Sequence, residues 1–155
     1  MTPAEIAALS DRELDAFIAE HLFGWTWLEH KSAHDAVWRK GLFPPEGSEY
    51  ERVNYAPGRF QPARPGIERF SDWDRCGYRA GSRPLNFMPH YSTDPAAMME
   101  VLEVLRKTHF VYIKCTPVIE CRVVLEVPAP GKCEIQVYGK LPRAVAEAAA
   151  LAKGA

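Results

Sequence analysis

Two histidine triplets are the residues best placed to do chemistry in this sequence, His30-Lys31-Ser32 and His90-Tyr91-Ser92. Paired H-x-S triplets are typical of a two-histidine phosphodiesterase acting on cyclic nucleotides, in which each imidazole transfers a proton and each hydroxyl holds a phosphate oxygen. That chemistry requires both triplets on adjacent strands facing one cleft. Pro89 precedes the second triplet, a helix start follows it, and the first lies in a polar stretch without strand character. The phosphodiesterase is therefore an alternative hypothesis, and a non-enzymatic protein is favoured.

A second histidine pattern could hold a metal ion. His30 and His34 are four residues apart and are flanked by Glu29 and Asp35, a spacing that aligns two imidazoles on a helix. The alternative is a solvated helical turn with its polar face outward. A third clear ligand is missing from the sequence, so we predict no metal and no cofactor.

Arginines and aromatic residues alternate between residues 28 and 88, which is the pattern most suggestive of binding. Guanidinium groups grip phosphate and aromatic faces stack on bases. The alternative is a scaffold in which arginines lie over aromatic rings and anchor a long loop. The predicted ligand-binding residues of this region and of the segment after it are Arg59, Arg64, Arg69, Trp73, Arg75, Tyr78, Arg79, Arg83, Phe87, Tyr91, Ser92 and Thr93.

The charge pattern limits which ligands this region could bind. Acidic residues are mixed with the arginines, so the segment lacks the clustered positive charge that duplex nucleic acid requires. A small nucleotide held by two or three arginines is compatible with it. At the run Tyr91-Ser92-Thr93-Asp94, we interpret Asp94 as a helix cap, because its carboxylate would repel a phosphate, and expect the other three side chains to face a neighbouring pocket.

The elements that must position these residues fall into three segments of a single predicted domain, residues 1–155. Residues 2–24 are expected to be helical, with a capping box from Ser10 to Glu13 and a stop at Gly24. Residues 28–88 are rich in proline and lack sustained periodicity, so we expect an ordered excursion with one or two short strands or helical turns. Residues 89–153 form the predicted core.

That core reads as a helix, three strands and a second helix. Proline follows the capping run at Asp94, and an apolar stripe continues to Leu105. Three β-rich runs come next, at residues 109–115, 120–127 and 132–138, with short connections that predict an antiparallel meander. An alanine-rich helix from Leu141 to about Ala152 follows. The predicted fold class is α+β, a layered α/β/α sandwich with an N-terminal helix and two helices in the C-terminal half.

Composition places the chain among globular proteins, with 155 residues, 47 % of them hydrophobic and 25 % charged. The net charge of −1 gives no general attraction to nucleic acid or to an acidic membrane. Neither an apolar run long enough to span a bilayer nor a secretory signal is present, so we expect a cytoplasmic protein without a membrane partner. None of the four cysteines forms a C-x-x-C pair, and we expect them to be reduced and to pack structurally.

The residues at the two ends of the chain resemble a known family. The run Pro89-His90-Tyr91-Ser92-Thr93-Asp94 before a helix, the meander, and the helix that begins Leu141-Pro142-Arg143 are similar to the phage ABA sandwich domain. The stretch from Leu14 to Trp25, which ends in the run Phe23-Gly24-Trp25-Thr26-Trp27, resembles the N-terminal helix of that family and its Gly-Trp exit. The resemblance implies a layered α/β/α domain of phage or prophage origin and brings no catalytic residues with it.

The sequence thus leads to a hypothesis with two alternatives. We expect a non-enzymatic phage accessory protein, acting in the host cytoplasm, that binds or sequesters a small anionic, nucleotide-like ligand, with a role in countering host defence. The enzymatic alternative uses His30, Ser32, His90 and Ser92 as catalytic residues. The third is a host-protein interaction module, and a homo-oligomer is possible in all three, because an exposed meander edge could pair with another copy.

Overall fold

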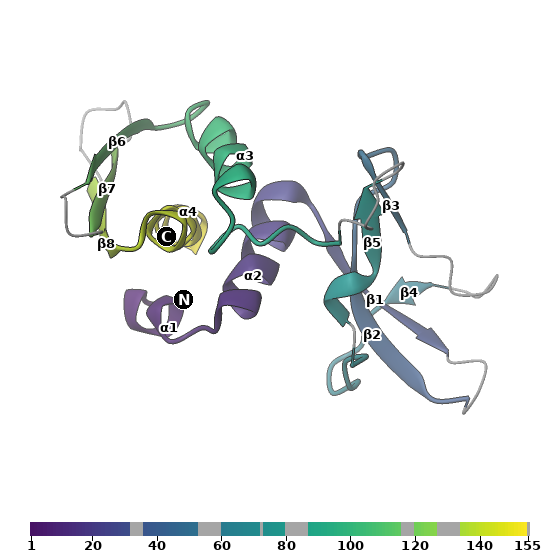
Figure 1. The fold of residues 1–155 in the computed structure, drawn as a ribbon. Helices are drawn as coiled ribbons and strands as arrows, with labels where there is room; N and C mark the ends of the chain where they lie inside the picture. Colours follow the sequence, from purple (N-terminus) through teal and green to yellow (C-terminus); the bar gives the residue numbers. More distant parts are fainter. Residues whose placement is uncertain are drawn as a thin grey trace. The chain divides into compact units, whose positions relative to one another are not determined.

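The computed structural model describes residues 1–31, 36–52, 60–71, 73–79, 87–115, 120–126 and 134–154, which group into two compact units. The terminal unit comprises Met1–Leu22 and Pro89–Ala155, and the inserted unit comprises Phe23–Met88. The three segments expected from the sequence map onto this division, because the first and last build the terminal unit and the excursion builds the inserted unit. The two units are drawn in Figure 1 and are described separately below.

The terminal unit begins with two helices, α1 (Pro3–Ala7) and α2 (Asp11–Phe23). The capping box before α2 is confirmed, since the Ser10 amide donates to the Glu13 carboxylate and the Glu13 amide donates back to the Ser10 hydroxyl. Thr2 and Glu5 make the same exchange before α1. Gly24 follows α2 with a φ of 71°, the left-handed conformation that ends a helix without a Cβ clash.

Helices α3 (Pro95–Leu105) and α4 (Leu141–Gly154) supply the rest of the helical layer. The Asp94 side chain accepts a hydrogen bond from the Ala96 amide, which confirms its assignment as a cap. Both helices bury apolar side chains, and six residues of α4, five of them alanines, are buried. Small side chains allow α4 to approach its neighbours closely, and it packs against α1, α3 and two strands of the sheet.

The predicted meander is confirmed as an antiparallel sheet of three strands, β6 (Phe110–Cys115), β7 (Cys121–Glu126) and β8 (Glu134–Gly139), with β7 in the centre. The α+β class is therefore confirmed. The α/β/α layering is not, because α3 and α4 contact the sheet from one side, as Figure 1 shows, and none of the described helices covers the other face. On that open face Phe110, Tyr112 and Tyr138 are 56 %, 54 % and 64 % exposed.

The expectation that the cysteines are reduced is wrong for two of them. Cys115 and Cys121 form a disulfide across β6 and β7, where they are direct partners in the ladder with Cα atoms 4.0 Å apart. A hairpin register brings together residues six positions apart, and this register cannot be read from cysteine spacing alone. Cys76 is a buried cysteine outside any disulfide, and Cys133 lies outside the described residues.

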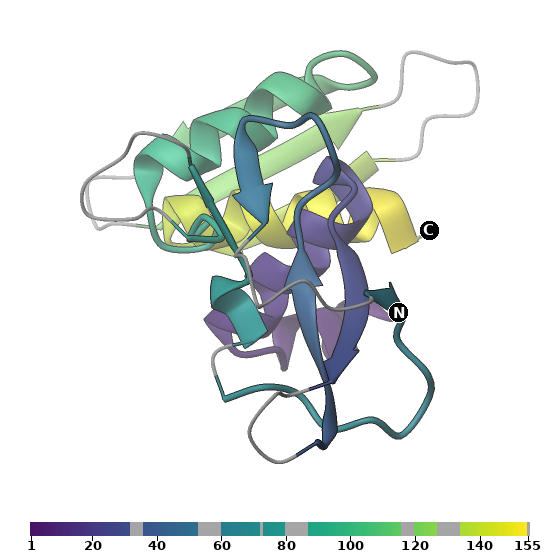
Figure 2. The same cartoon turned by 90° about the vertical axis from the view of Figure 1, so that its right-hand side faces the viewer.

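The inserted unit has more regular structure than the one or two short strands expected of it. Strand β1 (Thr26–Lys31) pairs with β2 (Trp38–Phe43) and β4 (Gln61–Pro62) in an antiparallel sheet of order β2-β1-β4. Strand β3 (Tyr50–Arg52) pairs with β5 (Gly77–Arg79), and a 3-10 turn covers Trp73–Arg75. Figure 2 shows β1 and β2 side by side along this unit. Proline-rich connections obscure these strands in the sequence.

The core of the inserted unit lies on one face of the β2-β1-β4 sheet. Leu28, Phe43 and Cys76 are buried there, and Phe60 and Phe70 pack against them. Gly41 in β2 allows this packing, because a Cβ at that position would lie 2.3 Å from the Cys76 sulfur. The opposite face of the sheet carries the residues of interest for binding. Among the described helices, none combines the length and the apolar character that crossing a membrane requires.

Candidate ligand-binding site

The register of β1 and β2 decides which side chains share the face opposite the core. Trp27 pairs with Leu42 and Glu29 pairs with Lys40 in the antiparallel ladder. Because side chains alternate along a strand, these four point away from the side that carries Leu28. An indole, a carboxylate and an ammonium group are therefore neighbours on one sheet face, which we call the binding face and define by Trp27, Glu29, Lys40 and the residues that pack on them.

Arg69 joins this face through a short stretch of chain beside β2. Lys40 and Arg69 form a parallel β-bridge, in which the Lys40 amide donates to the Glu68 carbonyl and the Phe70 amide donates to the Lys40 carbonyl, both at 2.9 Å. Bridge partners point to the same side, so Arg69 faces the Lys40 side while Phe70 turns into the core. Because successive side chains point to opposite sides, this short segment places the Arg69 cation on the surface and the Phe70 ring in the interior.

Four side chains form a cluster of cations and indoles, which we call the indole–arginine cluster: Trp27, Lys40, Arg69 and Trp73. The Arg69 guanidinium carbon lies 4.9 Å from the centroid of Trp27 and 5.1 Å from that of Trp73. The two indoles are 5.4 Å apart, and the Lys40 ammonium lies 6.0 Å from Trp27. The three distances from a cation to a ring are within the range of cation–π attraction, which is worth about 0.5–1 kcal/mol for each pair at exposed sites.

A second group on the same face centres on the buried carboxylate of Glu29. This carboxylate accepts hydrogen bonds from the side-chain amide of Gln61 and from the backbone N–H of Arg64. It also accepts one from the Arg64 guanidinium, whose Nε lies 2.7 Å away. Burial by itself raises the pKa of Glu29, but these hydrogen bonds outweigh burial and lower the pKa below its ordinary value. Arg64 also lies 5.5 Å from the Trp38 ring, and its side chain remains 57 % exposed.

The arrangement suits a ligand that is both aromatic and anionic. Trp27 and Trp73 offer π faces, and Lys40, Arg64 and Arg69 offer positive charge around the one buried carboxylate of Glu29. Among the described residues, no carboxylate pairs with Arg69, so its N–H groups are available to an oxyanion. Indole rings stack on bases and guanidinium groups bind phosphate, so this face combines the two contacts that a nucleotide needs.

The other predicted arginines are engaged in contacts that hold the inserted unit together. Arg79 forms an ion pair with Glu49 at 2.7 Å and lies over Tyr50, and Arg75 lies 5.5 Å from Phe87. These contacts correspond to the scaffold alternative, in which arginines and rings anchor the loops. Arg59 and Arg83 lie outside the described residues, and so does the side chain of Tyr78, a residue of β5. Of the predicted set, Arg64, Arg69 and Trp73 are brought together on the binding face.

The three remaining predicted residues belong to the terminal unit. Tyr91 and Ser92 are buried, and Thr93 is exposed in the turn before α3. The Ser92 amide donates to the Asp15 carboxylate at 2.7 Å, and its hydroxyl donates to the Asp11 carbonyl. Packing and backbone hydrogen bonds, rather than an open pocket, account for the surroundings of Tyr91 and Ser92.

Asp15 in α2 is a buried carboxylate that the sequence pattern did not reveal. Besides the Ser92 amide, it pairs with Arg12 at 3.0 Å, and His90 lies 3.8 Å away. Burial raises the pKa of Asp15 above its ordinary value, although the hydrogen bond from Ser92 and the charge of Arg12 act in the opposite direction. Arg12 also donates to the Pro89 carbonyl, so the group ties α2 to the turn before α3.

The histidine triplets do not have the geometry that the phosphodiesterase alternative requires. His30 lies in β1, contrary to the expectation of a polar stretch without strand character, and is buried with its ring 5.2 Å from Phe60. His90 is exposed and lies outside any strand. Ser32 and His34 are outside the described residues. In the part of the chain that the structure describes, no group of three potential metal ligands is found.

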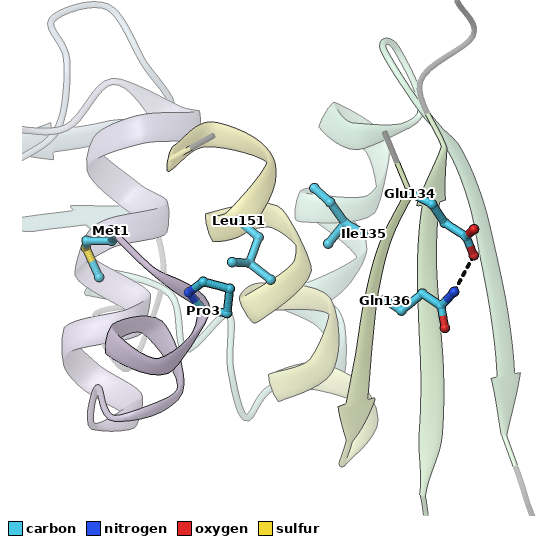
Figure 3. Close-up of a pocket in the computed structure, with 6 residues that line it drawn as sticks. All are labelled: Met1, Pro3, Glu134, Ile135, Gln136 and Leu151. Atoms are coloured by element: carbon cyan, nitrogen blue, oxygen red, sulfur yellow. Dashed lines mark hydrogen bonds between the residues drawn. The ribbon is translucent and has the colours of Figure 1, made fainter. Parts of the chain in front are cut away.

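The terminal unit has a depression of 440 Å³ beside its N-terminal residues. Figure 3 shows it between the N-terminal residues Met1 and Pro3, Leu151 of α4, and Ile135 of β8. Glu134 and Gln136 are hydrogen-bonded to each other and lie on the other side of β8 from Ile135. The depression is mainly apolar and has no converging charged groups, so it is a weaker candidate for a nucleotide-like ligand than the binding face.

Comparisons with known proteins give no information on the site. No family model matches the sequence, and searches of curated proteins and of solved structures find no match. The resemblance to the phage ABA sandwich domain therefore stays a prediction. Sequence reasoning missed Trp27 and Lys40 as site residues. The signal that could have found Trp27 was its position in an alternating run, where it shares a strand face with Glu29.

Proposed function

We propose that this chain is a non-enzymatic protein that binds a small anionic, nucleotide-like ligand on the binding face of the inserted unit. The observation that carries the proposal is the Arg69 guanidinium, which lies about equally far from two indole rings and has no carboxylate partner among the described residues. A base stacks on the exposed part of an indole, and the phosphate binds Arg69, with Lys40 and Arg64 as further cations.

The biological role in this proposal rests on the resemblance to a phage family. A protein that holds a nucleotide signal without changing it removes that signal from solution, and in a host cytoplasm such sequestration counters a nucleotide-based defence. The placement of His30 and His90 supports binding without turnover, because only His30 lies in a strand. Duplex nucleic acid and membranes are not partners in this proposal.

Titration calorimetry and thermal shift with cyclic nucleotides and ADP-ribose derivatives test the proposal. We expect one ligand class to bind and to raise the melting temperature. Arg69→Gln should weaken binding about 10- to 100-fold, because a hydrogen bond to a charged group contributes about 1.5–3 kcal/mol. Trp73→Leu should weaken binding through the loss of stacking, worth about 1–3 kcal/mol per base.

The matched control removes the same charge elsewhere. Arg106 is an exposed residue at the end of α3 in the terminal unit, so Arg106→Gln should bind like the unmodified chain. The proposal is wrong if none of the nucleotides binds the folded protein, or if Arg69→Gln and Arg106→Gln bind equally well. Chromatography of the ligand after heat denaturation separates sequestration, which returns it intact, from turnover.

A further inference from the structure

The open face of the β6-β7-β8 sheet carries its charges in two separate rows. At one end Glu126 of β7 is the direct partner of Glu134 of β8, and at the other end Arg122 of β7 is the partner of Lys114 of β6. Four residues separate Glu126 from Arg122 along β7, so the backbone positions of the two rows lie about 13 Å apart at 3.3 Å per residue. The long Arg122 side chain nevertheless reaches within 3.7 Å of Glu134. The face therefore has an acidic end and a basic end.

Aromatic and neutral side chains occupy the rest of this face. Tyr112, Val124 and Gln136 are partners across the three strands and form a middle row between the two charged ends. Phe110 extends the acidic row and Tyr138 extends the basic row. The three aromatic side chains are all more than half exposed, and the face has a shallow depression of 570 Å³. An exposed apolar patch with a polar rim is typical of an interaction surface.

We propose that a second copy of this chain docks on the open face, with the two-fold axis along the middle row. Rotation about that axis lays the acidic row of each copy over the basic row of the other. Glu126 then faces Arg122 of the second copy and Arg122 faces its Glu126, while the middle rows meet each other. Face-to-face sheets pack about 10 Å apart with their strands aligned within about 30°, which the side chains of an arginine and a glutamate can span.

The charge pattern selects this orientation over the other symmetric one. A two-fold axis along β7 would place Glu126 over Glu126 and Arg122 over Arg122, and like charges at an interface are repulsive. The Arg122 side chain is 43 % exposed, so its guanidinium can reach a carboxylate of a second copy. In the single chain, Arg122 forms a 3.7 Å ion pair with Glu134 and lies 5.9 Å from the Tyr138 ring centroid, and the side chains of Arg122 and Glu134 are both about 40 % exposed.

Size and charge both favour a second copy over other occupants. Three strands of six residues give a footprint of about 300 Å² at 4.8 Å between strands and 3.3 Å per residue. With side chains included, two copies bury on the order of 1,000 Å², the lower limit of specific interfaces, so a reversible dimer is expected. A single-stranded nucleic acid stacked on the aromatic side chains would meet the acidic row, which repels its phosphates.

Sedimentation velocity over a range of protein concentrations measures this association. The unmodified chain should shift from its monomer mass of 17.4 kDa toward twice that value as concentration rises. Glu126→Arg and Arg122→Glu should each remain monomeric, because each variant places like charges at both contacts. A mixture of the two single variants should dimerise, since every contact then joins opposite charges, and the double variant should dimerise alone.

The mixture keeps the test independent of folding, because a variant that had lost its fold would not be rescued by another. Far-ultraviolet circular dichroism of each variant checks the fold directly. The inference is overturned if the unmodified chain remains a monomer up to several hundred micromolar, or if the mixed single variants do not associate. A dimer that persists unchanged in both single variants also overturns it, as does a monomer that associates only when an oligonucleotide is added.

Discussion

The buried carboxylate of Asp15 should contribute to the stability of the terminal unit, and Asp15→Ala tests this. The substitution leaves the Ser92 amide without the acceptor that now lies 2.7 Å away, and it removes the partner of Arg12. An unsatisfied buried donor costs about 1–3 kcal/mol, and loss of the partly exposed ion pair adds up to about 1 kcal/mol. We therefore expect Asp15→Ala to lower the free energy of unfolding by about 1–4 kcal/mol.

Asp15→Asn separates the hydrogen bond from the charge. The asparagine oxygen can still accept from the Ser92 amide, and the burial of a charge is avoided, so a loss of only about 1 kcal/mol is expected. The exposed Glu103 in α3 provides a control, and Glu103→Ala should change stability by less than about 0.5 kcal/mol.

The assay uses the different spectroscopic signals of the two units. The four α-helices found among the described residues lie largely in the terminal unit, whereas all four tryptophans lie in the inserted unit. Urea unfolding followed by far-ultraviolet circular dichroism therefore reports mainly on the terminal unit, and tryptophan fluorescence reports on the inserted unit. If Asp15→Ala leaves the circular dichroism midpoint unchanged, or if Asp15→Asn is as damaging as Asp15→Ala, the interpretation of Asp15 as a satisfied buried acceptor fails.

The raised pKa of Asp15 adds a pH dependence with a defined sign. Between its unfolded pKa of about 3.9 and its higher folded pKa, the native state binds the proton more tightly than the unfolded state does. The contribution of Asp15 to stability is thus fully present below about pH 3.9 and is lost as the pH rises through the folded pKa. The stability of the unmodified chain minus that of Asp15→Asn should fall with rising pH, and an increase would contradict the burial argument.

Three further predictions follow from other contacts. Gly77→Ala should lower the free energy of unfolding followed by fluorescence by about 1–3 kcal/mol, because the added Cβ would lie 2.6 Å from the Pro44 ring. A carboxylate with a lowered pKa stabilises the native state above about pH 4.3 and loses that contribution as the pH falls. The free energy of unfolding followed by fluorescence should therefore fall less steeply toward acid pH in Glu29→Gln than in the unmodified chain. Arg143→Lys should destabilise the terminal unit in circular dichroism, because lysine lacks the guanidinium fork that reaches both Leu9 and Glu147.

The terminal unit could be predicted from sequence because its signals are local. Capping boxes at Thr2 and Ser10, the cap at Asp94, and short connections between β-rich runs each determine a boundary within a few residues of chain. Which face of the meander the helices cover depends instead on packing between distant segments. Arg143 shows this, since it binds Asp11, Ala7 and Leu9, which are more than 130 positions away.

The inserted unit shows where local patterns are insufficient. Strand β1 contains Glu29 and His30, two buried polar residues whose partners Gln61, Arg64 and Phe60 are 30 or more positions away. A polar residue in a strand is buried only when such a partner is present, and the partner cannot be identified from the strand itself. The sequence did indicate that arginines and rings would associate, but their pairing is decided by the sheet register and by the parallel bridge at Lys40.

Arg69 is held differently from Arg12 and Arg143 of the terminal unit, and this difference bears on its ability to bind a ligand. Arg12 and Arg143 donate hydrogen bonds to carboxylates and backbone carbonyls of neighbouring helices and turns, so these N–H groups already have acceptors. Arg69 is held by the faces of Trp27 and Trp73. A ring face attracts the positive charge of a guanidinium but does not accept its in-plane N–H bonds as an oxyanion would. An arginine positioned by indoles is therefore ordered and still able to donate, which is the state that a phosphate-binding residue needs before its ligand arrives.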